Sequence, residues 1–219
     1  MAKKKTVSNT TIISHYMDYV LDHGEEPKSV YAFAKANNFE EQQFYQHFGS
    51  FKAVEKHVFQ AFFDNTLKAL EKSPDYRQFD ARNKLLSFYF TFFENLTANR
   101  SYVLYALNRH KNKMKGLESL SELKKSFTAY IDQLDIETLD IKEERIDKFQ
   151  KRAMRESAWV QLLLTMKFWM DDTSAAFEKT DIYIEKSVNT SFDVLNIAPV
   201  KSLIDFGKFI FKERVHSKI

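Results

Sequence analysis

The scarcity of chain-breaking residues is the feature that most limits what this chain can fold into. Only four glycines and three prolines occur in 219 residues, and these are the residues that interrupt helices most strongly. Apolar residues recur three or four positions apart through most of the chain, which is the spacing of one face of an α-helix. We find no convincing strand pattern. The sequence therefore predicts an all-α fold built from long helices.

The few breakers divide the chain into ten expected helices. Gly24 is expected to end the first, Gly49 the third and Pro74 the fourth, while Gly116 separates the sixth from the seventh. The expected helices span about residues 9–23, 30–37, 40–48, 51–72, 85–96, 102–108, 117–134, 142–170, 181–196 and 199–214.

Composition excludes several classes of protein. The chain has no cysteine, which rules out a disulfide scaffold, a thiolate zinc site and a cysteine nucleophile, and which suits a reducing cytosol. No segment approaches the roughly 20 apolar residues of a membrane span. The six histidines are scattered, without the paired spacing of a zinc enzyme, and no glycine-rich phosphate loop occurs. We expect a cytoplasmic protein without a cofactor, an enzymatic activity or an integral membrane association.

Residues 29–54 carry the most specific motif. Two short helices joined by a tight turn lead into a long helix, which is a helix-turn-helix layout. The second helix ends in Tyr45-Gln46-His47-Phe48, and the first contains the pair Phe33-Ala34. This stretch resembles the head of the TetR family of transcriptional regulators. The resemblance implies a DNA-binding head at residues 1–50 and a helical ligand-binding and dimerisation domain at residues 51–219.

The resemblance also implies a function. It describes a bacterial, homodimeric, ligand-responsive regulator, a repressor, whose two heads enter successive major grooves of a double-stranded DNA operator. Glutamine can pair with the edge of adenine, whereas phosphate contacts set register. The implied base contacts are Gln42 and Gln43, and the implied phosphate contacts are Ser29, Tyr45, His47 and Lys52. Lys3, Lys4 and Lys5 would add nonspecific attraction.

The body of the chain, residues 51–219, contains an unusually aromatic set of side chains. Such a set either lines an apolar pocket for a hydrophobic or lipid-like small molecule, or forms an ordinary core. The pattern Phe-Tyr-Phe-Thr-Phe-Phe at residues 88–93 surrounds its helix, so that helix must be enclosed on all sides. The expected pocket residues are Phe88, Tyr89, Phe92, Tyr102, Tyr105, Phe127, Tyr130, Trp159, Leu163 and Met166.

Apolar stripes on the last expected helices suggest packing contacts, either with a second copy of the chain or within one copy. The helices at 142–170 and 181–196 look like the dimerisation element of the family, a four-helix bundle across a twofold axis, although the same stripes could be buried within one protomer. The expected interface residues are Val160, Leu164, Ile184, Val188, Asn189, Phe192 and Leu195. The segment 199–214 is basic and amphipathic, and we expect it to pack on the body rather than on a membrane surface.

Charge supports an alternative function. Residues 1–60 contain seven lysines and seven acidic residues, with no arginine, although the whole chain has a net charge of +3. Glu40 and Glu41 stand at the start of the expected recognition helix, whereas DNA affinity rests largely on cations. The alternative is a lipid-binding or accessory protein that keeps the TetR fold without sequence-specific DNA binding.

Overall fold

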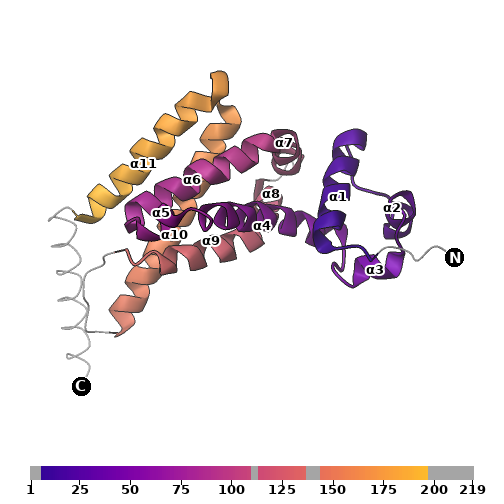
Figure 1. The fold of residues 1–219 in the computed structure, drawn as a ribbon, viewed down its shortest axis with the longest axis horizontal. Helices are drawn as coiled ribbons and strands as arrows, with labels where there is room; N and C mark the ends of the chain where they lie inside the picture. The colour runs from indigo at the N-terminus through magenta and orange to yellow at the C-terminus, as the bar shows by residue number, and fades with distance from the viewer. Residues whose placement is uncertain (1–5, 110–112, 137–143, 197–219) are drawn as a thin grey trace. The chain divides into compact units, whose positions relative to one another are not determined.

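The computed structural model describes residues 6–109, 113–136 and 144–196, which form helices and no strand (Figure 1). The predicted all-α fold is confirmed. The helices are α1 (Asn9–His23), α2 (Val30–Ala36), α3 (Glu41–Tyr45), α4 (Phe51–Leu70), α5 (Pro74–Gln78), α6 (Ala81–Ala98), α7 (Arg100–Asn108), α8 (Lys113–Glu118), α9 (Ser121–Gln133), α10 (Glu144–Asp171), a 3₁₀ turn η1 (Ala175–Phe177) and α11 (Glu178–Asn196).

The chain forms two compact units. Unit 1 comprises Met1–Lys72 and Thr91–Phe127, and unit 2 comprises Ser73–Phe90 and Thr128–Ile219. The boundaries between the units therefore fall between α4 and α5, inside α6 and inside α9. This division does not follow residue 50, so the separation into a head and a body remains a prediction about function.

Serine caps begin the helices at the N-terminal end of unit 1. The side chains of Ser8, Ser29 and Ser50 accept hydrogen bonds from the backbone N–H groups three residues on, which begins α1, α2 and α4. Gly24 ends α1 with a positive φ of 70°, a conformation that costs glycine little. The sequence therefore fixes both ends of α1 by local chemistry.

An aromatic core holds α2, α3 and α4 together. Phe33 of α2 and Phe44 of α3 each lie with their ring centroids 5.3 Å from the ring of Phe51. All three side chains are buried. Asn38, in the turn between α2 and α3, adopts a φ of 58°, which asparagine tolerates better than most residues. The predicted helix-turn-helix layout is present.

Helices α10 and α11 of unit 2 pack against each other as a helical hairpin, connected by a short segment that includes η1. Trp159, Met166 and Trp169 of α10 are buried, as are Ile184 and Val188 of α11. Phe168 and Tyr183 stack across the pair with centroids 4.5 Å apart. Asp171 is the last residue of α10.

The expected break at Pro74 is confirmed: α4 ends at Leu70, and Pro74 opens the short helix α5, where it occupies the first turn and its missing N–H has no cost. The expected break at Gly116 was wrong. Gly116 lies inside α8, where a Cβ atom would approach the carbonyl oxygen of Leu107 to 3.2 Å. Glycine at this position lets α8 approach α7 closely. The expected helix at 199–214 lies outside the described residues, and within the described ones no helix has the length and apolarity needed to cross a bilayer.

Candidate functional site

The start of α3 is organised by its own side chains. Glu40 is the N-cap, and its backbone N–H donates to Oε1 of Gln43 at 3.1 Å, which forms one half of a capping box. Gln43 is therefore half-buried and engaged within its own helix, whereas Gln42 is exposed. Of the two glutamines expected to contact bases, only Gln42 is fully exposed to solvent. Within the described residues, no hydrogen bond engages its side chain.

The remaining head residues have different surroundings. Tyr45 is 53% exposed, and its hydroxyl donates to Glu41 at 3.5 Å. His47 instead uses Nε2 in a 2.9 Å hydrogen bond with the carbonyl oxygen of Val7, so it ties the segment before α1 to the end of α3. Ser29 accepts from the backbone N–H of Ala32 at 3.1 Å. Tyr45 is thus presented to solvent, whereas His47 and Ser29 are engaged in internal hydrogen bonds.

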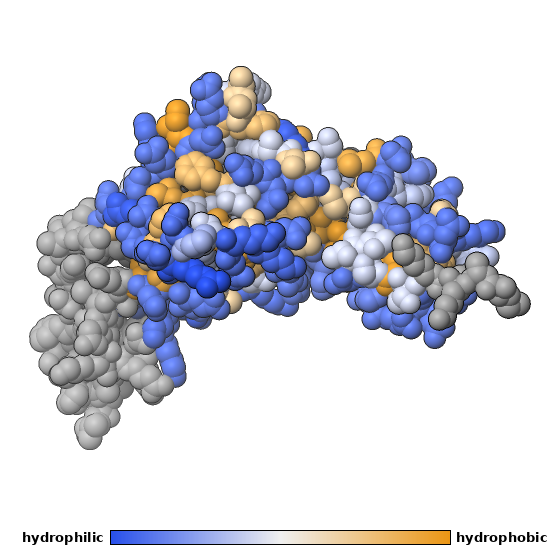
Figure 2. Space-filling model, in the orientation of Figure 1, coloured by the Kyte–Doolittle hydropathy of each residue, from blue (hydrophilic) through white to orange (hydrophobic). Residues whose placement is uncertain are grey.

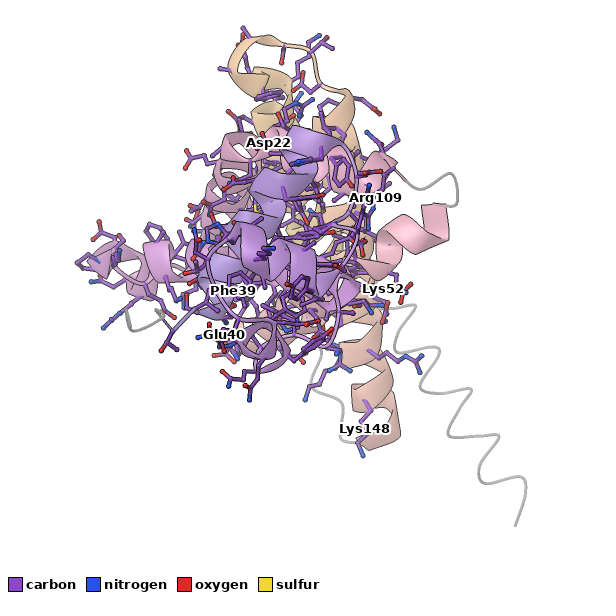
Figure 3. All side chains as sticks on the ribbon, turned by 90° about the vertical axis from the view of Figure 1, so that its right-hand side faces the viewer. Asp22, Phe39, Glu40, Lys52, Arg109 and Lys148 are labelled. Carbon is purple, nitrogen blue, oxygen red and sulfur yellow. The ribbon has the colours of Figure 1, made fainter. Side chains whose placement is uncertain are left out.

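Lys52, the last of the expected phosphate contacts, lies in an ion pair. Its Nζ is 2.8 Å from Oε2 of Glu118 in α8, and Lys56 binds the other oxygen of the same carboxylate at 3.3 Å. These two hydrogen bonds lower the pKa of Glu118 and keep it ionised. In the view of Figure 3, Lys52 lies on the same side as Arg109, away from Glu40.

A buried ion pair lies beside these lysines. Arg109 binds Glu55, which is 3% exposed, at 2.5 Å, and Ser119 donates to the other oxygen of Glu55 at 3.2 Å. Burial opposes the charge on Arg109, but its hydrogen bond with Tyr105 and the charge of Glu55 raise its pKa. The two ion pairs line a cavity of about 300 Å³ whose residues are Glu26, Lys52, Glu55, Lys56, Arg109, Glu118 and Ser119.

Two tyrosines of the same region are buried without a partner for their hydroxyls. Among the described residues, neither Tyr16 of α1 nor Tyr102 of α7 has a hydrogen bond to its hydroxyl. Their rings pack edge to face, 6.5 Å apart. Burial raises the pKa of both hydroxyls, and Glu55 adds to the shift. Tyr102 was an expected pocket residue, and the structure places it in the packing between α1 and α7.

The other expected pocket residues fill the interiors of the two units. In unit 1, Phe92 and Phe127 are fully buried and Tyr105 is half-buried against Arg109. In unit 2 the hydroxyl of Tyr130 lies 2.9 Å from that of Tyr76 and 3.2 Å from the carbonyl oxygen of Lys84. The unit 2 members are Phe88, Tyr89, Tyr130, Trp159, Leu163 and Met166, of which only Leu163 is more than 7% exposed.

A cavity of about 840 Å³ lies along α10 and α11. We call it the α10–α11 groove. None of the ten expected pocket residues lines it, whereas three expected dimer residues do: Val160, Leu164 and Phe192. Hydrophobic surface is visible along this part of unit 2 in Figure 2. The exposed large apolar residues at the groove are Val160, Leu164, Ile182 and Val194, each 44–55% exposed.

The remaining expected interface residues lie elsewhere. Ile184 and Val188 are completely buried between the helices of one protomer. Asn189 receives a hydrogen bond from Arg82 at 3.4 Å, and the side chain of Leu195 lies outside those described. Sequence reasoning missed Ile182 and Val194, which together with Lys186 and Thr190 form a second stripe at four-residue spacing on α11.

A helix-turn-helix followed by a larger helical region is the layout expected of an all-α transcriptional regulator. A comparison with protein-family models agrees: the C-terminal domain of tetracycline repressor-like proteins matches residues 84–210, more than half of the chain. The chain belongs to this TetR family of transcriptional regulators. The match confirms the resemblance drawn from residues 29–54, and it rests on a different part of the chain. A search of curated proteins finds no match.

Proposed function

We propose that the protein is a homodimeric, DNA-binding transcriptional repressor that responds to an apolar ligand. The observation that carries the DNA-binding part is the helix-turn-helix of α2 and α3, because its buried aromatic core presents Gln42 and Tyr45 to solvent at the end of unit 1. An exposed glutamine can read a base edge, and a tyrosine hydroxyl can contact phosphate.

Selection of bound sequences from random duplex DNA tests this proposal. We expect the full-length protein to enrich a palindrome whose half-sites lie about one helical turn apart. The Gln42→Ala variant should enrich a palindrome that is degenerate at one position of each half-site. Absence of enrichment, with no retention of DNA even at low salt, would contradict the proposal.

The charge of the head favours a second candidate function. Residues 1–50 carry five lysines, no arginine and six carboxylates, a net charge of −1, which gives little attraction for a polyanion. The candidate is a TetR-fold protein that binds a lipid-like molecule and has lost DNA binding. Lipid that co-purifies with the protein, together with failure of the DNA selection, would favour it.

The proposed dimer is supported by the α10–α11 groove. Its exposed apolar side chains would be covered if the same face of a second copy packed against them. We expect Leu164→Glu to yield a monomer in sedimentation experiments, because it places a charge in that interface. Leu21→Glu is the matched control, since Leu21 is similarly exposed at 45% but lies on α1. A Leu164→Glu protein that remains a dimer would contradict this assignment.

Ligand binding belongs to the same proposal. Most of the expected pocket residues are buried aromatic side chains inside one or the other of the two units, and the family relationship suggests that the protein binds a small molecule. A ligand would act on DNA binding only through a difference in affinity between two arrangements of the protein.

A further inference from the structure

The ion pairs between α4 and α8 hold two lysines that a DNA-binding head needs. Lys52 is in the first turn of α4, directly after the helix-turn-helix, and its side chain is 61% exposed. Lys56 is one turn further on and is 26% exposed. Both ammonium groups bind the single carboxylate of Glu118 on α8, 62 or more residues away in sequence.

We propose that Glu118 competes with DNA phosphate for Lys52 and Lys56, so that docking of α8 on α4 weakens DNA binding by the head. This inference rests on the proposed DNA-binding function and concerns how that function is regulated. A carboxylate and a phosphate oxygen are both anionic acceptors of the same ammonium N–H groups. A lysine that binds Glu118 must leave it, at least in part, to bind DNA.

The composition of the head makes these two lysines important. Residues 1–50 contain five lysines, three of them at positions 3–5, and no arginine, against six carboxylates. Each lysine that neutralises a phosphate contributes to affinity by releasing a counterion. Because the head has so few cations, the availability of Lys52 and Lys56 has a large effect on its attraction for DNA.

The position of Glu118 is fixed by its neighbours. Ser119, the next residue, donates a hydrogen bond to Glu55 of α4 at 3.2 Å, and Glu55 also binds Arg109 at the end of α7. Gly116 allows α8 to approach Leu107 of α7. The last residue of α8 and the residue that follows it thus both bind α4, and the carboxylate of Glu118 is held in place beside Lys52.

The surrounding cavity does not suggest a ligand site instead. Its three cations and three carboxylates balance, and each binds an oppositely charged neighbour: Arg109 binds Glu26 and Glu55, and the lysines bind Glu118. The arrangement therefore satisfies its own charges. The two lysines can, however, exchange the carboxylate of Glu118 for another anion, such as a DNA phosphate.

The coupling works in both directions. If DNA phosphate withdraws Lys52 from Glu118, α8 loses a contact with α4; conversely, any event that moves α8 away from α4 strengthens DNA binding. Such reciprocity is required of any two binding equilibria that share a component. α8 would then act as an intramolecular inhibitor of the head.

The experiment compares Glu118→Gln with Asp132→Asn in DNA-binding titrations of the full-length dimer. Both variants remove one negative charge, but Asp132 binds Arg155 rather than a lysine of α4. At low salt we expect Glu118→Gln to bind operator DNA about three- to fivefold more tightly than Asp132→Asn, the size of an exposed ion-pair effect. The difference should shrink as salt rises, and it should vanish when Lys52→Gln and Lys56→Gln are also present.

Two results would overturn the inference, and a third would instead show that the proposed DNA-binding function fails. If the wild type binds DNA but Glu118→Gln binds no better than Asp132→Asn, only the competition is wrong. If neither wild type nor Glu118→Gln retains DNA at low salt, the DNA-binding function itself fails. If DNA binds but carboxyl NMR shows the same Glu118 pKa with and without Lys52 and Lys56, the ion pairs themselves are absent in solution.

Discussion

Two neighbouring glutamines of α3 have different surroundings, and this determines which of them is available to a binding partner. Gln43 accepts a hydrogen bond from the backbone of Glu40, whereas Gln42 is exposed. Gln43 therefore stabilises the start of α3, whereas Gln42 is available to contact a binding partner.

Replacing the two glutamines separately should separate stability from specificity. We expect Gln43→Ala to lower the free energy of unfolding by about 0.5–1 kcal/mol, as loss of a cap does. Gln42→Ala should leave stability unchanged and reduce discrimination at one base pair by about 1–3 kcal/mol. Urea unfolding and DNA binding to single-base operator variants measure the two effects. A Gln43→Ala protein of normal stability with altered base preference would show the assignment to be reversed.

At the scale of an element, the hairpin between α10 and α11 depends on one carboxylate. Asp172 is 7% exposed and accepts four hydrogen bonds, from the N–H and hydroxyl groups of Ser174 and Thr180, at 2.7–3.0 Å. Burial alone would raise its pKa, but these hydrogen bonds lower it from 3.8 to about 2. The carboxylate caps the start of α11 and so positions that helix against α10.

Acid should therefore weaken the hairpin over a defined range. An Asp with a lowered pKa stabilises the folded state fully above its unfolded value of 3.8, and the stabilisation is lost as pH falls toward about 2. We expect Asp172→Asn to be less stable than wild type at pH 7 and to show a smaller loss of stability below pH 4. Asp171→Asn, its exposed neighbour, is the control and should retain the full acid dependence in urea unfolding measured across pH.

At the scale of the whole molecule, buried tyrosines set an upper pH limit. Burial raises the pKa of Tyr16, Tyr89, Tyr102 and Tyr130 above the ordinary value of 10.0. When the chain unfolds, these hydroxyls regain ordinary pKa values and lose protons above pH 10. Stability is thus unaffected below pH 10 and falls above it.

Ultraviolet titration should reveal this limit. Of the ten tyrosines in the chain, we expect four to stay protonated as pH passes 10 and to ionise only when the helical circular dichroism signal is lost. In urea all ten should titrate together near pH 10. Smooth ionisation of all ten in the folded protein would show that these four side chains are accessible to solvent.

The sequence predicted the helices better than the surfaces. Ser29, Ser50 and Gly24 act within a few residues of themselves, so local patterns located the ends of α1, α2 and α4. Periodicity showed that α11 has an apolar face, but not that Ile184 and Val188 meet α10 of their own protomer while Ile182 and Val194 remain exposed. Aromatic content likewise did not distinguish a filled core from a pocket.

Contacts between distant residues left no signal in the sequence. Three helices, α5, α6 and α7, lie between Lys52 and Glu118 along the chain, and each of the two is an ordinary charged residue of a helix surface. The roles of Gln42 and Gln43 also depended on three-dimensional geometry, because both residue types suit a recognition helix. Only the folded arrangement of α3, α4 and α8 showed which groups are available to a partner.

The contacts of α7 with α1 and α4 limit how this family member could be recombined with others. Tyr102 covers Tyr16 and packs on Phe59, and Arg109 neutralises the buried Glu55. A fragment ending at residue 72 would lack Tyr102 and Arg109. The carboxylate of Glu55, which is buried in the intact protein, would then have no cation beside it. Residues 1–72 therefore cannot be transferred to another protein by themselves. A chimaera that joins them to a different ligand-binding domain must also include α7.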